Sequence, residues 1–108
     1  MEPKIEIACL LDFYGPLLTE SRREILRLYL DEDLSLGEIA EQMGVTRQAV
    51  ADQVARSREK LRFYEAKLGL FARWRAVTDA ARKCLAALDK KDERAMREAL
   101  DNILRIER

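Results

Sequence analysis

The sequence contains no histidine and only two cysteines, so the side chains that most often bind zinc or serve as activated nucleophiles are nearly absent. Cys9 and Cys84 lie far apart in the chain, and neither belongs to a CxxC motif. We therefore expect no metal site and no cofactor, and we interpret both cysteines as small apolar residues. There is also no glycine-rich loop of the kind that binds phosphate, and no pair of carboxylates with the spacing expected for acid and base catalysis. No catalytic residue is assigned, and an enzyme is not expected.

Glycine and proline are scarce as well, with four and two residues in a chain of 108. Hydrophobic residues make up 48% of the chain and charged residues 37%. A sequence with few helix breakers and many good helix formers favours helices packed on helices. The length suits one domain, so we predict a single all-helical domain over residues 1–108.

Long apolar runs are missing too, and the N-terminus lacks a basic segment followed by an apolar one. A transmembrane helix needs about 20 consecutive apolar residues, so no membrane insertion is expected. The predicted location is cytoplasmic.

The chain has no excess of positive charge, because 20 basic residues balance 20 acidic ones. Proteins that bind nucleic acid are usually basic overall. Residues 1–45 hold ten acidic and four basic side chains, whereas residues 46–62 hold five basic and two acidic ones. Since phosphate neutralisation supplies most non-specific affinity for DNA, we expect only weak binding to duplex DNA.

The first three helices are predicted from their end signals. The first runs from about Lys4 to Tyr14, ends at Gly15-Pro16, and is apolar around nearly its whole circumference, which could require a covering surface from another subunit. The second begins near Thr19 or Ser21 and ends at residues 31–33. Ser35 caps the third, with Glu38 placed to complete a capping box.

The segment SLGEIAEQMGVTRQAV, residues 35–50, has the spacings of a helix-turn-helix. Ala40 is the small residue expected where the two helices cross. Gly44, four positions later, can adopt the positive φ of the tight turn, and Val50 supplies the apolar anchor of the second helix. We assign the helix-turn-helix core to residues 35–56.

Residues 47–68 contain no glycine or proline and predict one long recognition helix, capped by Thr46 and ended by Gly69. Its apolar positions alternate steps of four and three, which is typical of a heptad seam with one polar member, Ser57. We interpret this seam as the interface of a homodimer. Its apolar members are Val50, Val54, Leu61, Tyr64 and Leu68.

Residues 70–106 predict a C-terminal helical hairpin with its turn at residues 89–92. One apolar stripe contains Leu70, Trp74, Val77, Ala81, Cys84 and Leu88, and the other contains Met96, Ala99, Leu100, Ile103 and Leu104.

The outward face of the long helix is the candidate binding surface for nucleic acid or a protein partner. Arg47 and Gln48 can read base edges, whereas Ala51 and Ala55 offer only methyl groups and Asp52 would repel phosphate. The predicted contact residues are Thr46, Arg47, Gln48, Ala51, Asp52, Arg56, Arg58, Lys60 and Arg62.

The run from Ser35 to Leu61 resembles the last region, region four, of bacterial sigma factors. The chain is also similar to the YlxM family of small bacterial helix-turn-helix proteins. The similarity lies in the blocks LLDFYGPLLT (residues 10–19) and SLGEIAEQMGVTRQAVADQVAR (residues 35–56), followed by Leu61, Tyr64-Glu65 and Lys67-Leu68. The resemblance covers roughly residues 7–75. Many members carry a large aromatic residue where this chain has Ala51, so contacts at that position do not transfer.

This resemblance implies an all-α fold, dimers, and an accessory or regulatory role in the signal recognition particle (SRP) pathway. That role is attached to the family largely because its gene neighbours the gene of the SRP GTPase. Three hypotheses follow: a factor that binds the SRP GTPase, the SRP RNA or both; a DNA-binding transcription regulator that uses Arg47, Gln48 and Arg56; and a structural dimerisation adaptor.

Overall fold

A computed structural model of the chain describes residues 1–107, which form six α-helices, one short 3-10 turn and no strand. The predicted all-α fold is confirmed. These helices are arranged in two compact units, an N-terminal unit of residues 1–68 and a C-terminal hairpin that begins at Gly69. The composition predicted one domain instead. The division falls at Gly69, whose φ of +62° ends one long helix before the next begins.

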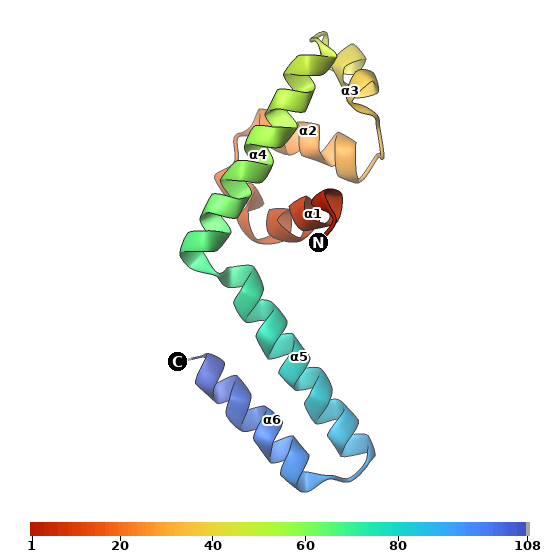
Figure 1. Ribbon diagram of the computed structural model, residues 1–108. Coiled ribbons are helices and arrows are strands. Elements are labelled where there is room, and N and C mark those ends of the chain that lie inside the picture. The colour runs from red at the N-terminus through yellow and green to blue at the C-terminus, as the bar shows by residue number, and fades with distance from the viewer. Residues whose placement is uncertain (108) are drawn as a thin grey trace. The chain divides into compact units, whose positions relative to one another are not determined.

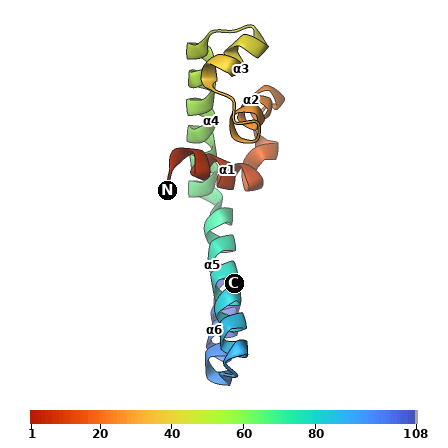
Figure 2. The same cartoon turned by 90° about the vertical axis from the view of Figure 1, so that its right-hand side faces the viewer.

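The N-terminal unit is built around its longest helix, α4 (Arg47–Leu68). Helices α1 (Pro3–Tyr14), α2 (Glu20–Leu30) and α3 (Leu36–Met43) all contact α4, and the turn η1 (Gly15–Leu17) joins α1 to α2. Figure 1 shows the three shorter helices gathered on one side of α4. Figure 2, turned by 90°, shows α2 and α3 following one another along α4.

Side-chain caps fix where α2 and α3 begin. Thr19 caps α2 by accepting a hydrogen bond from the backbone N–H of Arg22, so the helix starts from Thr19 rather than Ser21. Glu24, in the second turn of α2, forms an ion pair with Arg27 at 2.8 Å. At α3 the predicted capping box is confirmed, because Ser35 and Glu38 exchange hydrogen bonds of 3.0 and 3.1 Å.

The core of the helix-turn-helix lies where α2, α3 and α4 meet. Ile25 and Leu28 from α2 and Ile39 and Ala40 from α3 surround Val50 of α4, which is fully buried. Burial of a valine, leucine or isoleucine side chain contributes about 1.5–3 kcal/mol, so these members of the cluster supply much of the stability of the unit.

The heptad stripe of α4 faces this same protomer, which corrects the prediction of a dimer seam. Val50 and Leu61 are fully buried by the chain's own helices, and Ser57 is 1% exposed. Val54 and Tyr64 are half-buried, and only Leu68 is exposed. A stripe with this spacing indicates that something covers the helix, and here α1, α2 and α3 do so.

The first helix is also covered largely from within the N-terminal unit. Ile7, Leu10 and Tyr14 are buried, whereas Ile5 on the remaining side is 55% exposed. Tyr14 donates a 2.6 Å hydrogen bond from its hydroxyl to Glu65, and its ring lies 5.9 Å from that of Tyr64. These contacts attach α1 to the C-terminal half of α4.

The C-terminal hairpin consists of α5 (Leu70–Asp89) and α6 (Glu93–Ile106), as predicted from the sequence. Asp92 caps α6 by accepting from the backbone N–H of Ala95, and Lys91 adopts a positive φ in the turn. The residues buried between the two helices are small: Ala80, Ala87 and Ala99. None of the helices within residues 1–107 is long and apolar enough to cross a membrane.

Candidate nucleic-acid or partner interface

The turn between α3 and α4 has the geometry that a helix-turn-helix requires. Gly44 ends α3 with a φ of +69°, and its N–H donates to the carbonyl of Ala40. Val45 donates to the same carbonyl at 3.0 Å. Thr46 then caps α4 by accepting from the backbone N–H of Ala49 at 3.0 Å, which satisfies one of the free donors of the first turn.

The first turn of α4 is the most open part of this motif. Every residue from Glu41 to Ala49 is exposed, and Arg47 and Gln48 lie within this stretch. Met43 and Val45, which the sequence analysis did not assign to the site, are apolar and exposed beside them. Within residues 1–107 no ion pair includes Arg47. This guanidinium is therefore available to an external acceptor.

The middle of α4 is less basic than its sequence suggests. Arg56 pairs with Asp52 one turn earlier at 3.0 Å, and both side chains are about half exposed. Ala55 is exposed and Ala51 is half-buried. Because both are alanines, neither side chain offers a hydrogen-bonding group to a ligand. This part of the helix presents a neutral ion pair beside two methyl groups.

Glu6 of α1 forms ion pairs with the next two arginines. Arg58 donates from Nε to Glu6 at 3.1 Å, and Arg62 donates to both carboxylate oxygens at 2.7 and 3.2 Å. The Glu6 side chain is only 19% exposed. The hydrogen bond from Arg62, with help from Arg58, lowers the pKa of Glu6 below its usual value although burial opposes this shift. The same contact raises the pKa of Arg62.

The predicted contact residues therefore do not form one continuous face, which corrects the sequence interpretation. Residues two positions apart on an α-helix point about 200° apart, so Lys60 lies on the opposite flank from Arg58 and Arg62. Arg56 lies on the flank of Lys60, whose ammonium is 5.8 Å from the ring of Tyr64. The structure groups Thr46, Arg47 and Gln48 at the exposed start of α4 and separates the other cations from them.

Sequence reasoning missed Glu6 because it lies 52 and 56 residues from the two arginines it binds. The spacing of residues within one helix cannot predict a contact between residues so far apart in the sequence. The only indication was the excess of acidic residues in the N-terminal half.

Comparison with known proteins assigns this arrangement to a family. The family model described as "Putative helix-turn-helix protein, YlxM / p13 like" (UPF0122) matches residues 1–103. The chain belongs to the UPF0122 family. Its match to the UPF0122 model includes α5 and most of α6, and so extends beyond the resemblance over residues 7–75.

Three UPF0122 proteins are similar in sequence to this chain over most of their own length. A UPF0122 protein of Symbiobacterium thermophilum is 47% identical over 94 residues, which covers 87% of this chain and 88% of that protein. One from Clostridium kluyveri is 40% identical over 103 residues, with 95% and 93% covered. One from Halalkalibacterium halodurans is 37% identical over 107 residues, with 95% and 98% covered. Family membership thus supports a helix-turn-helix protein with a binding or regulatory role.

Proposed function

We propose that this protein is an accessory or regulatory factor of the SRP pathway, which binds the SRP RNA, the SRP GTPase or both through the exposed start of α4. The contact residues are Thr46, Arg47 and Gln48, which lie in the stretch of α3, turn and α4 that is exposed from Glu41 to Ala49. The pathway itself is suggested by the family resemblance, and the surface is suggested by the structure.

The observation that carries the proposal is the contrast between Arg47 and the later arginines of α4. Arg47 has no carboxylate partner within the described residues, whereas Arg56, Arg58 and Arg62 are each held in an ion pair. An unpaired guanidinium on an exposed helix start attracts phosphate or carboxylate oxygens at little cost in broken contacts. The binding surface is therefore short and located at one end of the helix.

This surface suits a structured RNA backbone or an acidic protein patch better than a selected DNA sequence. A helix that reads the major groove presents side chains with hydrogen-bonding groups along successive turns. After Gln48, α4 offers Ala51 and Ala55, and the carboxylate of Asp52 would oppose a phosphate. DNA-binding transcription regulation is the alternative, and it is favoured only by Arg47 and Gln48 themselves.

The test is a titration of the purified protein against the SRP RNA, the SRP GTPase and the two together, with a duplex promoter DNA in parallel. Wild-type protein should bind at least one SRP component, and salt should weaken this binding. Arg47→Glu should reduce that affinity by at least about tenfold, since one charge-assisted contact contributes about 1.5–3 kcal/mol. The matched control is Arg94→Glu, the same change at an exposed arginine of the hairpin.

Two outcomes would reject the proposal. One is the absence of binding to either SRP component, and the other is binding that Arg47→Glu and Arg94→Glu affect equally. Tight, sequence-selective binding to the duplex at physiological salt, lost in Arg47→Glu, would instead establish the transcription alternative.

A further inference from the structure

Glu6 places one carboxylate between two arginines of another helix. The Nε–H groups of Arg58 and Arg62 donate to the same oxygen, Glu6 Oε1, at 3.1 and 2.7 Å, and a second nitrogen of Arg62 donates to Oε2 at 3.2 Å. Arginine binds phosphate in the same way as carboxylate, because both anions present two oxygens to its planar group of donors. These two guanidinium groups therefore already have an arrangement that can hold a phosphate, and Glu6 occupies it.

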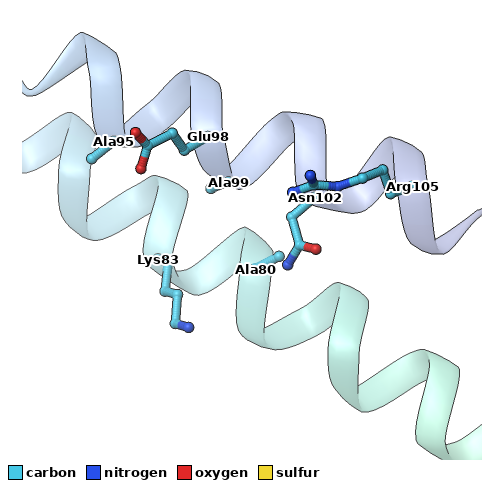
Figure 3. Close-up of a pocket in the computed structure, with 7 residues that line it drawn as sticks. All are labelled: Ala80, Lys83, Ala95, Glu98, Ala99, Asn102 and Arg105. Atoms are coloured by element: carbon cyan, nitrogen blue, oxygen red, sulfur yellow. The ribbon is translucent and has the colours of Figure 1, made fainter.

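The groove between α5 and α6, both of which the structure describes, shows no such convergence of charged groups. Figure 3 shows Lys83 of α5 and Glu98 and Arg105 of α6 spread along this groove. Glu98 pairs instead with Arg94 on its own helix, and the two side chains are 70% and 91% exposed. The Glu6 side chain, by contrast, is 19% exposed and joins two helices. The site around Glu6 is therefore partly enclosed, whereas the groove of the hairpin is open.

We propose that Arg58 and Arg62 form a binding site for a phosphate of a nucleic-acid backbone, and that Glu6 masks this site until the phosphate displaces its carboxylate. The exchange replaces one oxyanion by another on the same donors. The proposal does not rest on the proposed SRP function, because two guanidinium groups recognise a phosphate in any nucleic acid that carries it.

The Glu6 side chain can leave the arginines while α1 stays on α4. Ile7, Leu10 and Tyr14 hold α1 in place through side chains that are at most 3% exposed. The ion pairs of Glu6 add stability to this packing but do not carry it alone. The two arginine side chains are 31% and 56% exposed, so a ligand can reach them from solvent.

A third arginine lies on the same flank of α4. Eleven residues make close to three full turns at about 100° per residue, so Arg47 is nearly in line with Arg58, about 16 Å away along the helix axis. Arg62 continues this line by about one turn in the other direction. Arginines spread over about 22 Å of one flank suit an extended polyanion better than a single small ion.

The side chains between these arginines favour a nucleic-acid backbone over a protein. Protein interfaces are built around an apolar centre with aromatic or large aliphatic anchors. Between Arg47 and Arg58 this flank offers only the methyl groups of Ala51 and Ala55. A chain of phosphates needs cations at intervals and no apolar anchor. The flank therefore has what a phosphate backbone requires and lacks what a protein interface requires.

The experiment measures the affinity of the full chain for a labelled uridine oligomer of about 12 nucleotides by fluorescence anisotropy at low salt, where phosphate contacts are strongest. Glu6→Gln should raise this affinity by about fivefold, because the phosphate then has no carboxylate to displace. Glu59→Gln is the matched control, since it removes the same charge from an exposed position of α4 next to Arg58. It should change the affinity by less than about twofold.

The gain from Glu6→Gln should disappear when Arg58→Gln and Arg62→Gln are added. It should persist when Arg82→Gln and Arg97→Gln are added, since these remove two charges from exposed positions of the hairpin. Circular dichroism establishes that each variant is helical before affinities are compared. Equal gains in Glu6→Gln and its matched control would overturn the proposal, as would a gain that survives the loss of both arginines of the site.

Wild-type protein allows a test without any substitution. The NMR signals of the Nε–H groups of Arg58 and Arg62 should shift when the uridine oligomer is added, because their acceptor changes from carboxylate to phosphate. Signals that stay unchanged at saturating oligomer would show that Glu6 is not displaced, and the proposal would then be wrong.

Two further ligands identify what the site recognises. A deoxyuridine oligomer of equal length should show the same gain in Glu6→Gln, because the arginines contact phosphate and not sugar. A gain restricted to one of the two oligomers would contradict recognition through phosphate alone. The SRP GTPase serves as the protein ligand, and a gain for it with none for either oligomer would overturn the assignment to a nucleic-acid backbone.

Discussion

At the scale of single residues, Glu6 determines how much of the basic sequence of α4 is available to a ligand. Its carboxylate oxygens accept hydrogen bonds from the guanidinium nitrogens of Arg58 and Arg62 at 2.7 to 3.2 Å. The carboxylate takes the position that a phosphate oxygen would otherwise occupy between two arginines. Counting cations along the helix therefore overestimates the charge that a partner meets.

The same contact gives stability that depends on pH. The pKa of Glu6 is lowered in the folded protein, first by Arg62 and then by Arg58, from an ordinary value of 4.5. A carboxyl group with a lowered folded pKa stabilises the protein above its unfolded pKa, and this contribution disappears as the pH falls through the folded pKa. Glu6 thus contributes to stability at neutral pH, and this contribution declines only once the pH falls below the ordinary value of 4.5 toward the lowered folded pKa.

We predict that Glu6→Gln lowers the free energy of unfolding by about 1 kcal/mol at pH 7, a value reduced because Arg62 is partly exposed to solvent. The difference from wild type should shrink between pH 7 and pH 3, because the Glu6 carboxylate becomes protonated as the pH falls toward its lowered folded pKa. Urea unfolding followed by circular dichroism at the two pH values measures this. Glu98→Gln, in an exposed pair with Arg94, should change little at either pH. An equal effect of Glu6→Gln at both pH values would contradict the role assigned to its charge.

At the scale of elements, the sequence predicted those features that depend on a few neighbouring residues. Four such features were predicted, because each depends on residues close together in the sequence. They are the capping box of Ser35 and Glu38, the left-handed turn at Gly44, the cap at Thr46 and the end of α4 at Gly69. The sequence could not predict which helices pack against the apolar stripe of α4. The spacing of apolar residues indicates that this face is buried, but it does not identify the element that buries it. The sequence analysis predicted that the stripe packs against a second subunit, whereas α1, α2 and α3 of the same chain pack against it.

Two glycines of the helix-turn-helix should respond in opposite ways to the same change. Gly44→Ala should destabilise the protein by about 1 kcal/mol, because a φ of +69° strains any residue with a Cβ. Gly37→Ala should stabilise it by about 0.5 kcal/mol, since alanine is the better helix former and its Cβ would meet only Ser35 Oγ at 3.9 Å. Thermal unfolding of both variants measures these shifts. A stabilising Gly44→Ala would show that the turn does not need its left-handed residue.

At the scale of the whole molecule, the two units bury and expose different kinds of side chain. The N-terminal unit buries the stripe of α4 and exposes the start of that helix, and the hairpin buries alanines and exposes leucines. Composition did not predict this division, because a good balance of apolar and charged residues does not reveal which helices pack together. The exposed leucines became apparent only once their neighbours were known, since the sequence placed Leu88, Leu100 and Leu104 on the inner stripes.

The most direct test of the proposed function is affinity purification of the tagged full chain from cells that produce it, followed by assays for the SRP GTPase, the SRP RNA and bound DNA. Wild-type protein and Arg94→Glu should each retain at least one SRP component, and Arg47→Glu should retain markedly less of it. Absence of both SRP components, or recovery of a defined promoter fragment in their place, would contradict the proposed function.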